Sequence, residues 1–121
     1  MILDSGVLTI YAVSSTEGTA PPPVKWTLSE KRTAVFGDRV VGATRYYAAA
    51  KVGQRIDRAV RIWRDHTIPL SVRDVCLADG IYYLIRKITP TTDEDGLLVI
   101  DLDLEDNDGV IRGYLGEDSN R

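Results

Sequence analysis

The stretch Arg55-Ile56-Asp57-Arg58-Ala59-Val60-Arg61-Ile62-Trp63-Arg64 carries an arginine at every third position, threaded through apolar residues. As a helix it would gather its apolar side chains on one stripe, and its basic side would suit a nucleic acid or a membrane. As a strand it would send Arg55 and Arg61 to one face. Arg58 and Arg64 would then lie on the other face. Periodicity alone favours the helix, and the choice decides how the rest of the chain is interpreted.

The length and charge of the chain narrow the possibilities. Its 121 residues suffice for one compact domain. The net charge of -3 argues against a general nucleic-acid binder. That charge is polarised, because residues 24–92 sum to +7 (13 basic, 6 acidic) and residues 93–121 to -8 (2 basic, 10 acidic). Such polarity suits subunits that pack a basic flank against an acidic one, although a solvated acidic tail gives the same count.

Targeting and cross-linking signals are weak. The single cysteine, Cys76, excludes an intramolecular disulfide, and no stretch approaches the ~18 apolar residues of a membrane span. The first residues lack the basic and apolar regions of a secretory signal. We therefore expect a soluble protein made inside the cell, with no membrane partner.

Strand patterns dominate the chain. Residues 6–13 are rich in β-branched and aromatic side chains, and residues 24–28 alternate after three prolines. The pair Asp79-Gly80 supplies the positive φ values of a type I′ turn. It is flanked by residues 72–77 and 81–88, which read as two strands. The sequence therefore predicts two early strands and a later hairpin.

The end of the chain predicts a closing strand and a tail. Residues 97–104 alternate, with the inward set Leu98, Ile100, Leu102 and Leu104 and the outward set Asp101 and Asp103. Apolar residues are sparse in 105–121, which predicts a flexible acidic tail. Residues 32–53 form a long connection with a short helix-prone patch at 46–51, and a connection of this length is usually functional. The expected fold is mainly β, a small barrel or sandwich.

Candidate chemical motifs fail when they are aligned. Residues 37–44 have the glycine spacing of a phosphate-binding loop, but Ala43 stands where the lysine is needed. The acidic clusters at 93–96 and 106–109 lack the first and last ligands of a calcium loop. One cysteine and one histidine make no zinc site. We expect no catalytic residues, no metal and no cofactor.

The order of these features is familiar. It runs through Tyr46-Tyr47-Ala48-Ala49-Ala50-Lys51-Val52-Gly53, then Ile56-Asp57-Arg58-Ala59-Val60-Arg61-Ile62, then Asp79-Gly80-Ile81-Tyr82-Tyr83-Leu84-Ile85-Arg86 and a leucine-rich closing strand. Over about residues 6–104 this order resembles the head closure, or head-tail joining, proteins of long-tailed bacteriophages, which serve as connectors or stoppers. In that family the segment that corresponds to the arginine run is a strand, so we adopt the strand.

The resemblance implies a function without enzymatic activity. Residues 1–104 would form one β-barrel-like domain that assembles into a homo-oligomeric ring, matching the symmetry of the portal. The ring would close the DNA-filled head and dock the tail. Its partners would be further copies of itself, a portal or adaptor protein and tail proteins, with packaged DNA only nearby. The implied location is the virion neck, with the host cytoplasm during assembly.

Two sets of site residues follow from this resemblance. The connection at 32–53 looks like the element that reaches the channel or a neighbouring subunit, with the candidates Arg39, Arg45, Tyr46, Tyr47 and Lys51. The candidate inter-subunit charges are Arg55, Arg58, Arg61, Arg64, Asp93, Glu94 and Asp95. We expect the strand arginines to meet protein acids in a ring, since arginines are rarely buried unpaired.

Two alternatives stay open. A tail terminator or tail completion protein also forms a ring from a small β-rich fold. A single-stranded nucleic-acid-binding β-barrel would use the arginine run with Tyr46 and Tyr47 as a groove. The acidic segment from residue 93 onward opposes the second alternative, because it would repel phosphates.

Overall fold

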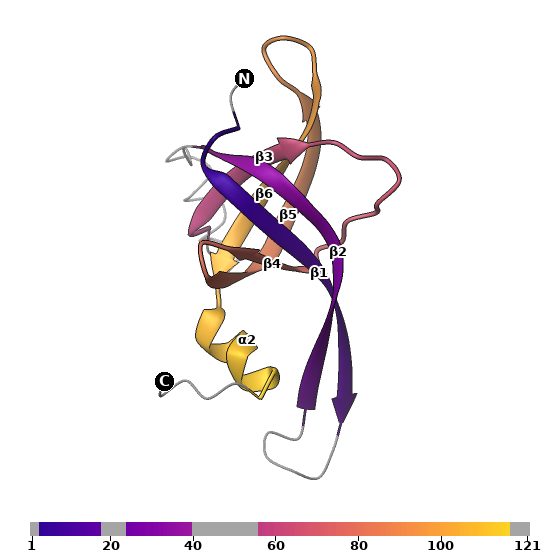
Figure 1. Ribbon diagram of the computed structural model, residues 1–121, viewed down its shortest axis with the longest axis vertical. Helices are drawn as coiled ribbons and strands as arrows, with labels where there is room; N and C mark the ends of the chain where they lie inside the picture. The colour runs from indigo at the N-terminus through magenta and orange to yellow at the C-terminus, as the bar shows by residue number, and fades with distance from the viewer. Residues whose placement is uncertain (1–2, 18–23, 40–55, 117–121) are drawn as a thin grey trace.

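The computed structural model describes residues 3–17, 24–39 and 56–116. The strands are β1 (Gly6–Glu17), β2 (Val24–Arg39), β3 (Arg58–Trp63), β4 (Val75–Ala78), β5 (Ile81–Thr92) and β6 (Leu98–Asp106), and one short helix, α2 (Asp108–Tyr114), follows them. Neighbouring strands pair antiparallel in the order β1-β2-β3-β6-β5-β4, and β4 pairs again with β1 (Figure 1). The predicted mainly β fold is confirmed.

The sheet closes on itself as an irregular barrel. Strand lengths run from 4 residues in β4 to 16 in β2, so the long strands continue past the short ones. β4 pairs with β1 only between Leu8 and Tyr11, whereas β1 pairs with β2 as far as Glu17 and Val24. Residues 12–17 and 24–29 therefore form a two-stranded arm that extends beyond the barrel, at the lower end of Figure 1.

The hydrophobic core fills the inside of this ring. Within the barrel, alternate residues of the strands point inward, as the two-residue period of a strand requires, apart from the register shifts at Ile10/Tyr11 and Ile85/Lys87. The buried cluster consists of Leu8, Ile10, Phe36, Val60, Ile62, Cys76, Ala78, Tyr83, Ile85, Ile100, Leu102 and Leu104. All six strands contribute to it, so the barrel shares one core.

The closing strand β6 matches the predicted alternation with two exceptions. Ile100 and Leu102 are buried in the core as predicted, but Leu98 is 45% exposed because it lies at the outer end of the hairpin. Asp101 and Asp103 alternate with the core residues, yet both are buried. The outer face of β6 is thus covered, which the alternation alone did not indicate.

Strand β2 replaces part of the predicted long connection. Residues 32–39 were expected to begin the loop at 32–53, but they continue β2, and Phe36 within them is fully buried. The charged residues that end at Arg32 gave no strand pattern in the sequence. They lie where β2 passes from the solvated arm into the barrel. The rest of the connection, including the helix-prone patch at 46–51, lies outside the described residues.

The predicted hairpin is confirmed. Asp79 and Gly80 both have positive φ, 53° and 77°, and Ala78 pairs with Ile81 across them. The strand before the turn is shorter than predicted, starting at Val75. The strand after it is longer and runs through Pro90 to Thr92. Proline is tolerated there because β4 accompanies β5 only as far as Leu84, so the outer part of β5 is an edge.

The acidic C-terminal residues differ from the flexible tail expected over 105–121. Residues 105 and 106 end β6, and α2 follows, with Ile111 fully buried. The helix is fastened by polar contacts that sparse apolar residues do not reveal. Arg112 pairs with Asp108 at 2.9 Å and donates a hydrogen bond to the Gly80 carbonyl. Residues 117–121 lie outside the described residues.

Candidate functional site

The arginine run is a strand over the described residues, as the resemblance implied and against its periodicity. In β3, Val60 and Ile62 point into the core, and Arg61 lies on the opposite face. Arg58 and Arg64 stand at the two ends of this segment. Arg55 lies outside the described residues. The part of the run that the structure describes, residues 56–64, therefore presents no continuous basic surface.

Arg58 closes one end of the barrel. Its guanidinium stacks over the Phe36 ring at 4.9 Å and binds both carboxylate oxygens of Asp38, at 2.7 and 3.0 Å. It also pairs with Asp79 of the β4–β5 turn at 2.8 Å. The pKa of Arg58 is raised, chiefly by the hydrogen bond to Asp38. One side chain thus joins β2, β3 and the hairpin turn, and its acids belong to the same chain.

The Asp38 carboxylate should make the folded state sensitive to acid. Its hydrogen bond with Arg58 holds the pKa of Asp38 below the ordinary 3.8. This stability is present above 3.8 and is lost as the pH falls through the lowered folded-state pKa. We expect Asp38→Asn to be less stable than the wild type at pH 7, with the two stabilities converging as the pH falls below the ordinary 3.8 and through the lowered folded-state pKa. Urea unfolding across pH measures this, and exposed Asp4→Asn should follow the wild type instead.

Arg61 and Arg39 converge on Asp101 on the outer face of the sheet. Arg61 lies directly opposite Asp101 in the β3–β6 register and binds it with two hydrogen bonds, of 2.7 and 3.1 Å. Arg39 reaches the same carboxylate at 2.8 Å. This pairing accounts for the burial of Asp101. Arg58 and Arg61 both pair with carboxylates of their own chain, and their predicted contact with a neighbouring subunit's acids stays a prediction.

Arg64 and Arg32 both lie at the end of β3 that is far from Arg58. Arg64 donates to the carbonyls of Thr91 and Val99, at 2.8 and 3.3 Å. Arg32, which sequence reasoning did not select, donates to the carbonyl of Trp63, and burial lowers its pKa. These arginines cap backbone carbonyls where the strands end, so they hold the barrel together.

The predicted acidic residues lie in the turn between β5 and β6. This turn, together with Leu98, the first residue of β6, is here called the acidic turn (residues 93–98). Asp93 is buried, and its Oδ1 atom accepts hydrogen bonds from the backbone amides of Asp95 and Leu97, at 2.9 and 2.8 Å. The carboxylates of Asp93, Glu94 and Asp95 lie within 4.8 Å of one another. Glu94 and Asp95 are exposed. Because Asp93 is committed to the backbone, its role here is to shape the turn.

The candidate loop residues are largely beyond what the structure describes. Of the five selected, Arg39 is described and binds Asp101. Arg45, Tyr46, Tyr47 and Lys51 fall in residues 40–55, outside the described residues. Their role at a subunit interface or channel stays a prediction.

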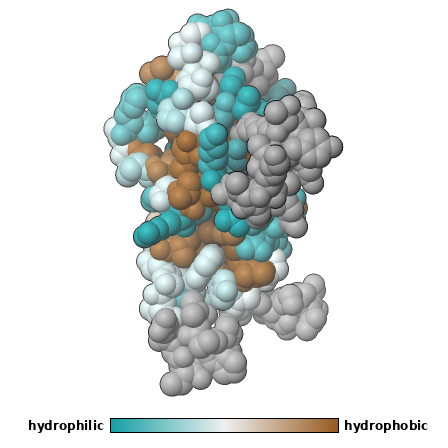
Figure 2. All heavy atoms as spheres, turned by 180° about the vertical axis from the view of Figure 1, so that it is seen from behind, coloured by the Kyte–Doolittle hydropathy of each residue, from teal (hydrophilic) through white to brown (hydrophobic). Residues whose placement is uncertain are grey.

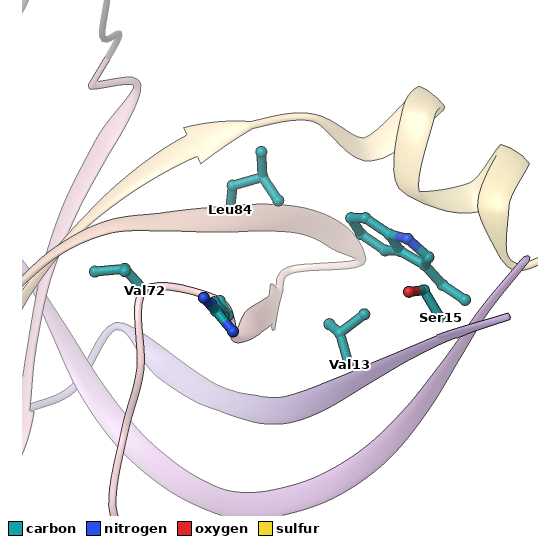
Figure 3. Close-up of a pocket in the computed structure, with 6 residues that line it drawn as sticks. Val13, Ser15, Val72 and Leu84 are labelled. Carbon is teal, nitrogen blue, oxygen red and sulfur yellow. The ribbon is translucent and has the colours of Figure 1, made fainter. Parts of the chain in front are cut away.

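An apolar pocket, which sequence reasoning missed, lies between the arm, β5 and the segment before β4. Its volume is about 390 Å³, and it is lined by Val13, Ser15, Trp26, Val72, Arg73 and Leu84. Figure 3 shows the labelled lining side chains coming from separate parts of the chain around one opening. Trp26 is fixed beside the pocket by Tyr114 of α2, with ring centroids 4.7 Å apart. No local pattern marks such a site, because it exists only once distant segments fold together.

The described surface is uneven in polarity. On the face opposite to that of Figure 1, hydrophobic residues gather over the middle and lower part, while the upper end is mainly hydrophilic (Figure 2). The large exposed hydrophobic side chains of the described residues are Val7, Val35, Val72, Leu97, Leu98 and Val110. Leu97 and Leu98 follow the acids of the acidic turn, and Val72 lines the apolar pocket.

Cys76 is buried in the core and is predicted to be unreactive. Burial raises the pKa of its thiol to about 12, so the nucleophilic thiolate is scarce at neutral pH. A maleimide reagent at pH 7.5 should leave Cys76 unmodified in the folded protein and label it fully in denaturant. Mass spectrometry before and after unfolding measures this. Rapid labelling of the folded protein would contradict the described core.

Comparisons with known proteins give no family for this chain. Neither the models of known protein families nor the curated proteins include a match to it. Among the described residues, no helix has the length and apolar character needed to cross a membrane.

Proposed function

We propose that this chain is a structural neck protein of a tailed bacteriophage. It forms a homo-oligomeric ring beneath the portal, closes the DNA-filled head and offers a surface to the tail. Support comes from the sequence resemblance over residues 6–104. The strand over residues 58–63 and the hairpin at Asp79-Gly80 are features that this resemblance requires.

The observation that carries the proposal is the placement of two projections on a small closed sheet. The arm extends from one end of the molecule, and the acidic turn extends from the other (Figure 1). A ring subunit needs contact surfaces on more than one side, because it meets two neighbours and further proteins above and below. Projections at opposite ends suit such a subunit.

The charges of the arginine run favour this structural role over a single-strand groove. Arg58 and Arg61 are bound to carboxylates of the same chain, so a phosphate backbone would compete with existing ion pairs. Of the tyrosines in β5, Tyr83 is buried in the core and Tyr82 lies against Arg112 at 4.9 Å. Neither is placed as an open stacking platform.

Electron microscopy with the cognate portal tests the proposal. Purified protein mixed with portal rings should add a ring of density beneath the portal, and mixing with assembled tail tubes in a second sample separates head closure from tail termination. Density only at the end of the tail tube would favour a tail terminator. Single subunits in every mixture would count decisively against a ring-forming neck protein.

A further inference from the structure

The apolar pocket has the character of a docking site. Four of its six lining residues are apolar, and Arg73 adds a positive charge beside them. Its volume of about 390 Å³ lies within the range of sites that hold a ligand or a few side chains. Val72 is 58% exposed at this site, so apolar surface remains open to a partner. The pocket therefore suits an apolar segment that carries acids.

The acidic turn has the complementary chemistry. Leu97 and Leu98 are 49% and 45% exposed, beside the exposed acids Glu94 and Asp95. The shape of the turn is set in advance by the Asp93 side chain, and Gly96 at φ 77° allows the reversal. Because the turn is already ordered, docking it costs little conformational entropy.

The acidic turn cannot reach the pocket of its own chain. Leu84 lines the pocket, and Thr92 precedes the turn at the far end of the same strand. Eight residue steps of about 3.3 Å separate them by roughly 25 Å. A contact between the two features must therefore join two molecules.

We propose that the acidic turn of one copy docks in the apolar pocket of a second copy of this chain. Leu97 and Leu98 cover the apolar lining, and Glu94 and Asp95 face Arg73. The two surfaces differ, so the contact is heterologous and generates a ring when its rotation closes. The proposal rests on the proposed function, because it supplies the contact between neighbours that a ring requires.

This contact is weak when it stands alone. A single turn entering a pocket buries less than the roughly 1,000 Å² of a stable interface. In a closed ring each subunit makes the contact twice, and ring closure multiplies the effect. We therefore expect monomers at low concentration, and oligomers that form at high concentration or on a portal and dissociate as salt screens the charges.

Disulfide trapping tests the contact directly. The double variant Leu97→Cys/Val72→Cys should give a ladder of cross-linked oligomers under mild oxidation, because each copy carries both halves of the contact. The matched control is Leu97→Cys/Val7→Cys, since Val7 is 57% exposed on another part of the surface. Buried Cys76 takes no part. A ladder of equal strength from both variants would overturn the proposal.

Charge reversal tests the role of Arg73. Adding Arg73→Glu to the trapping variant should lower the cross-linked yield about tenfold. Adding Glu94→Lys and Asp95→Lys as well should restore most of it. A yield indifferent to both changes would remove the electrostatic part of the contact and, with it, the orientation proposed here.

The outcomes for the contact and for the neck function are separable. If the variants Leu97→Asp and Arg73→Glu form portal-bound rings as readily as the wild type, this contact is overturned and the neck function stands. A specific ladder from the trapping variant, with no ring on either portal or tail, would overturn the neck function and leave the contact standing.

Discussion

Replacing Leu102 by alanine is expected to lower the free energy of unfolding by about 3 kcal/mol. Leu102 is fully buried in β6, directly opposite Val60 of β3 and Ile88 of β5. Its loss removes buried methyl groups and leaves a cavity between three strands that cannot collapse without breaking their register. For a domain of this size the melting temperature should fall by roughly 10 °C or more.

Urea unfolding followed by tryptophan fluorescence measures this change. The matched control is Leu98→Ala, the same substitution on the same strand, where the side chain is 45% exposed. We expect the control to cost less than about 1 kcal/mol at concentrations where the protein is monomeric. Equal losses for the two variants would mean that β6 is not held in the register described.

Alternation predicted most of the strands because one face of each is buried. It worked for Ile100 and Leu102, and the Asp79-Gly80 turn fixed the register of β4 and β5. It failed where burial has another cause. Asp103 is buried on the outer face of the sheet. Arg32 is a charged residue within β2, at the point where the strand passes from the arm into the barrel. The local pattern of apolar residues predicts neither of these two placements.

The C-terminal helix shows a second limit. Only Ile111 among the residues of α2 is buried, so no apolar stripe marks the helix. The helix is fastened by the Asp108 carboxylate, which accepts a hydrogen bond from the backbone amide of Tyr82, and by Arg112, which donates to the Gly80 carbonyl. These contacts join segments far apart in the chain. From composition alone, the same residues are predicted to form a solvated tail.

The candidate site was the least predictable part. The arginine run was correctly assigned to a strand through a resemblance, yet the acid that binds Arg61 lies 40 positions away in another strand. The apolar pocket collects Val13, Trp26 and Leu84 from separate elements. Such pairings are set by the way the strands close into a barrel. The local pattern of a single sequence does not predict that closure.

Removing the Asp101 carboxylate should be the most damaging change to a charged residue on the outer face. Its side chain is 7% exposed and holds two guanidiniums, from Arg61 and Arg39. Asp101→Ala leaves these two positive charges close together without their shared partner. We expect a loss of about 2 to 3 kcal/mol, below the full cost of a buried unpaired charge because Arg39 is 32% exposed to solvent.

A double-mutant cycle separates the ion pair from the effects of truncation. Arg61→Ala and the double variant Arg61→Ala/Asp101→Ala complete it, with the free energy of unfolding measured by urea. We expect a coupling energy of about 1 to 2 kcal/mol, because the double variant removes the repulsion as well as the attraction. Glu105→Ala is the comparison, since its pair with Arg86 is more open, with Arg86 37% exposed, and should contribute less than about 1 kcal/mol. Additive effects of Arg61 and Asp101 would show that their ion pair adds no net stability and that the outer face is held by packing instead.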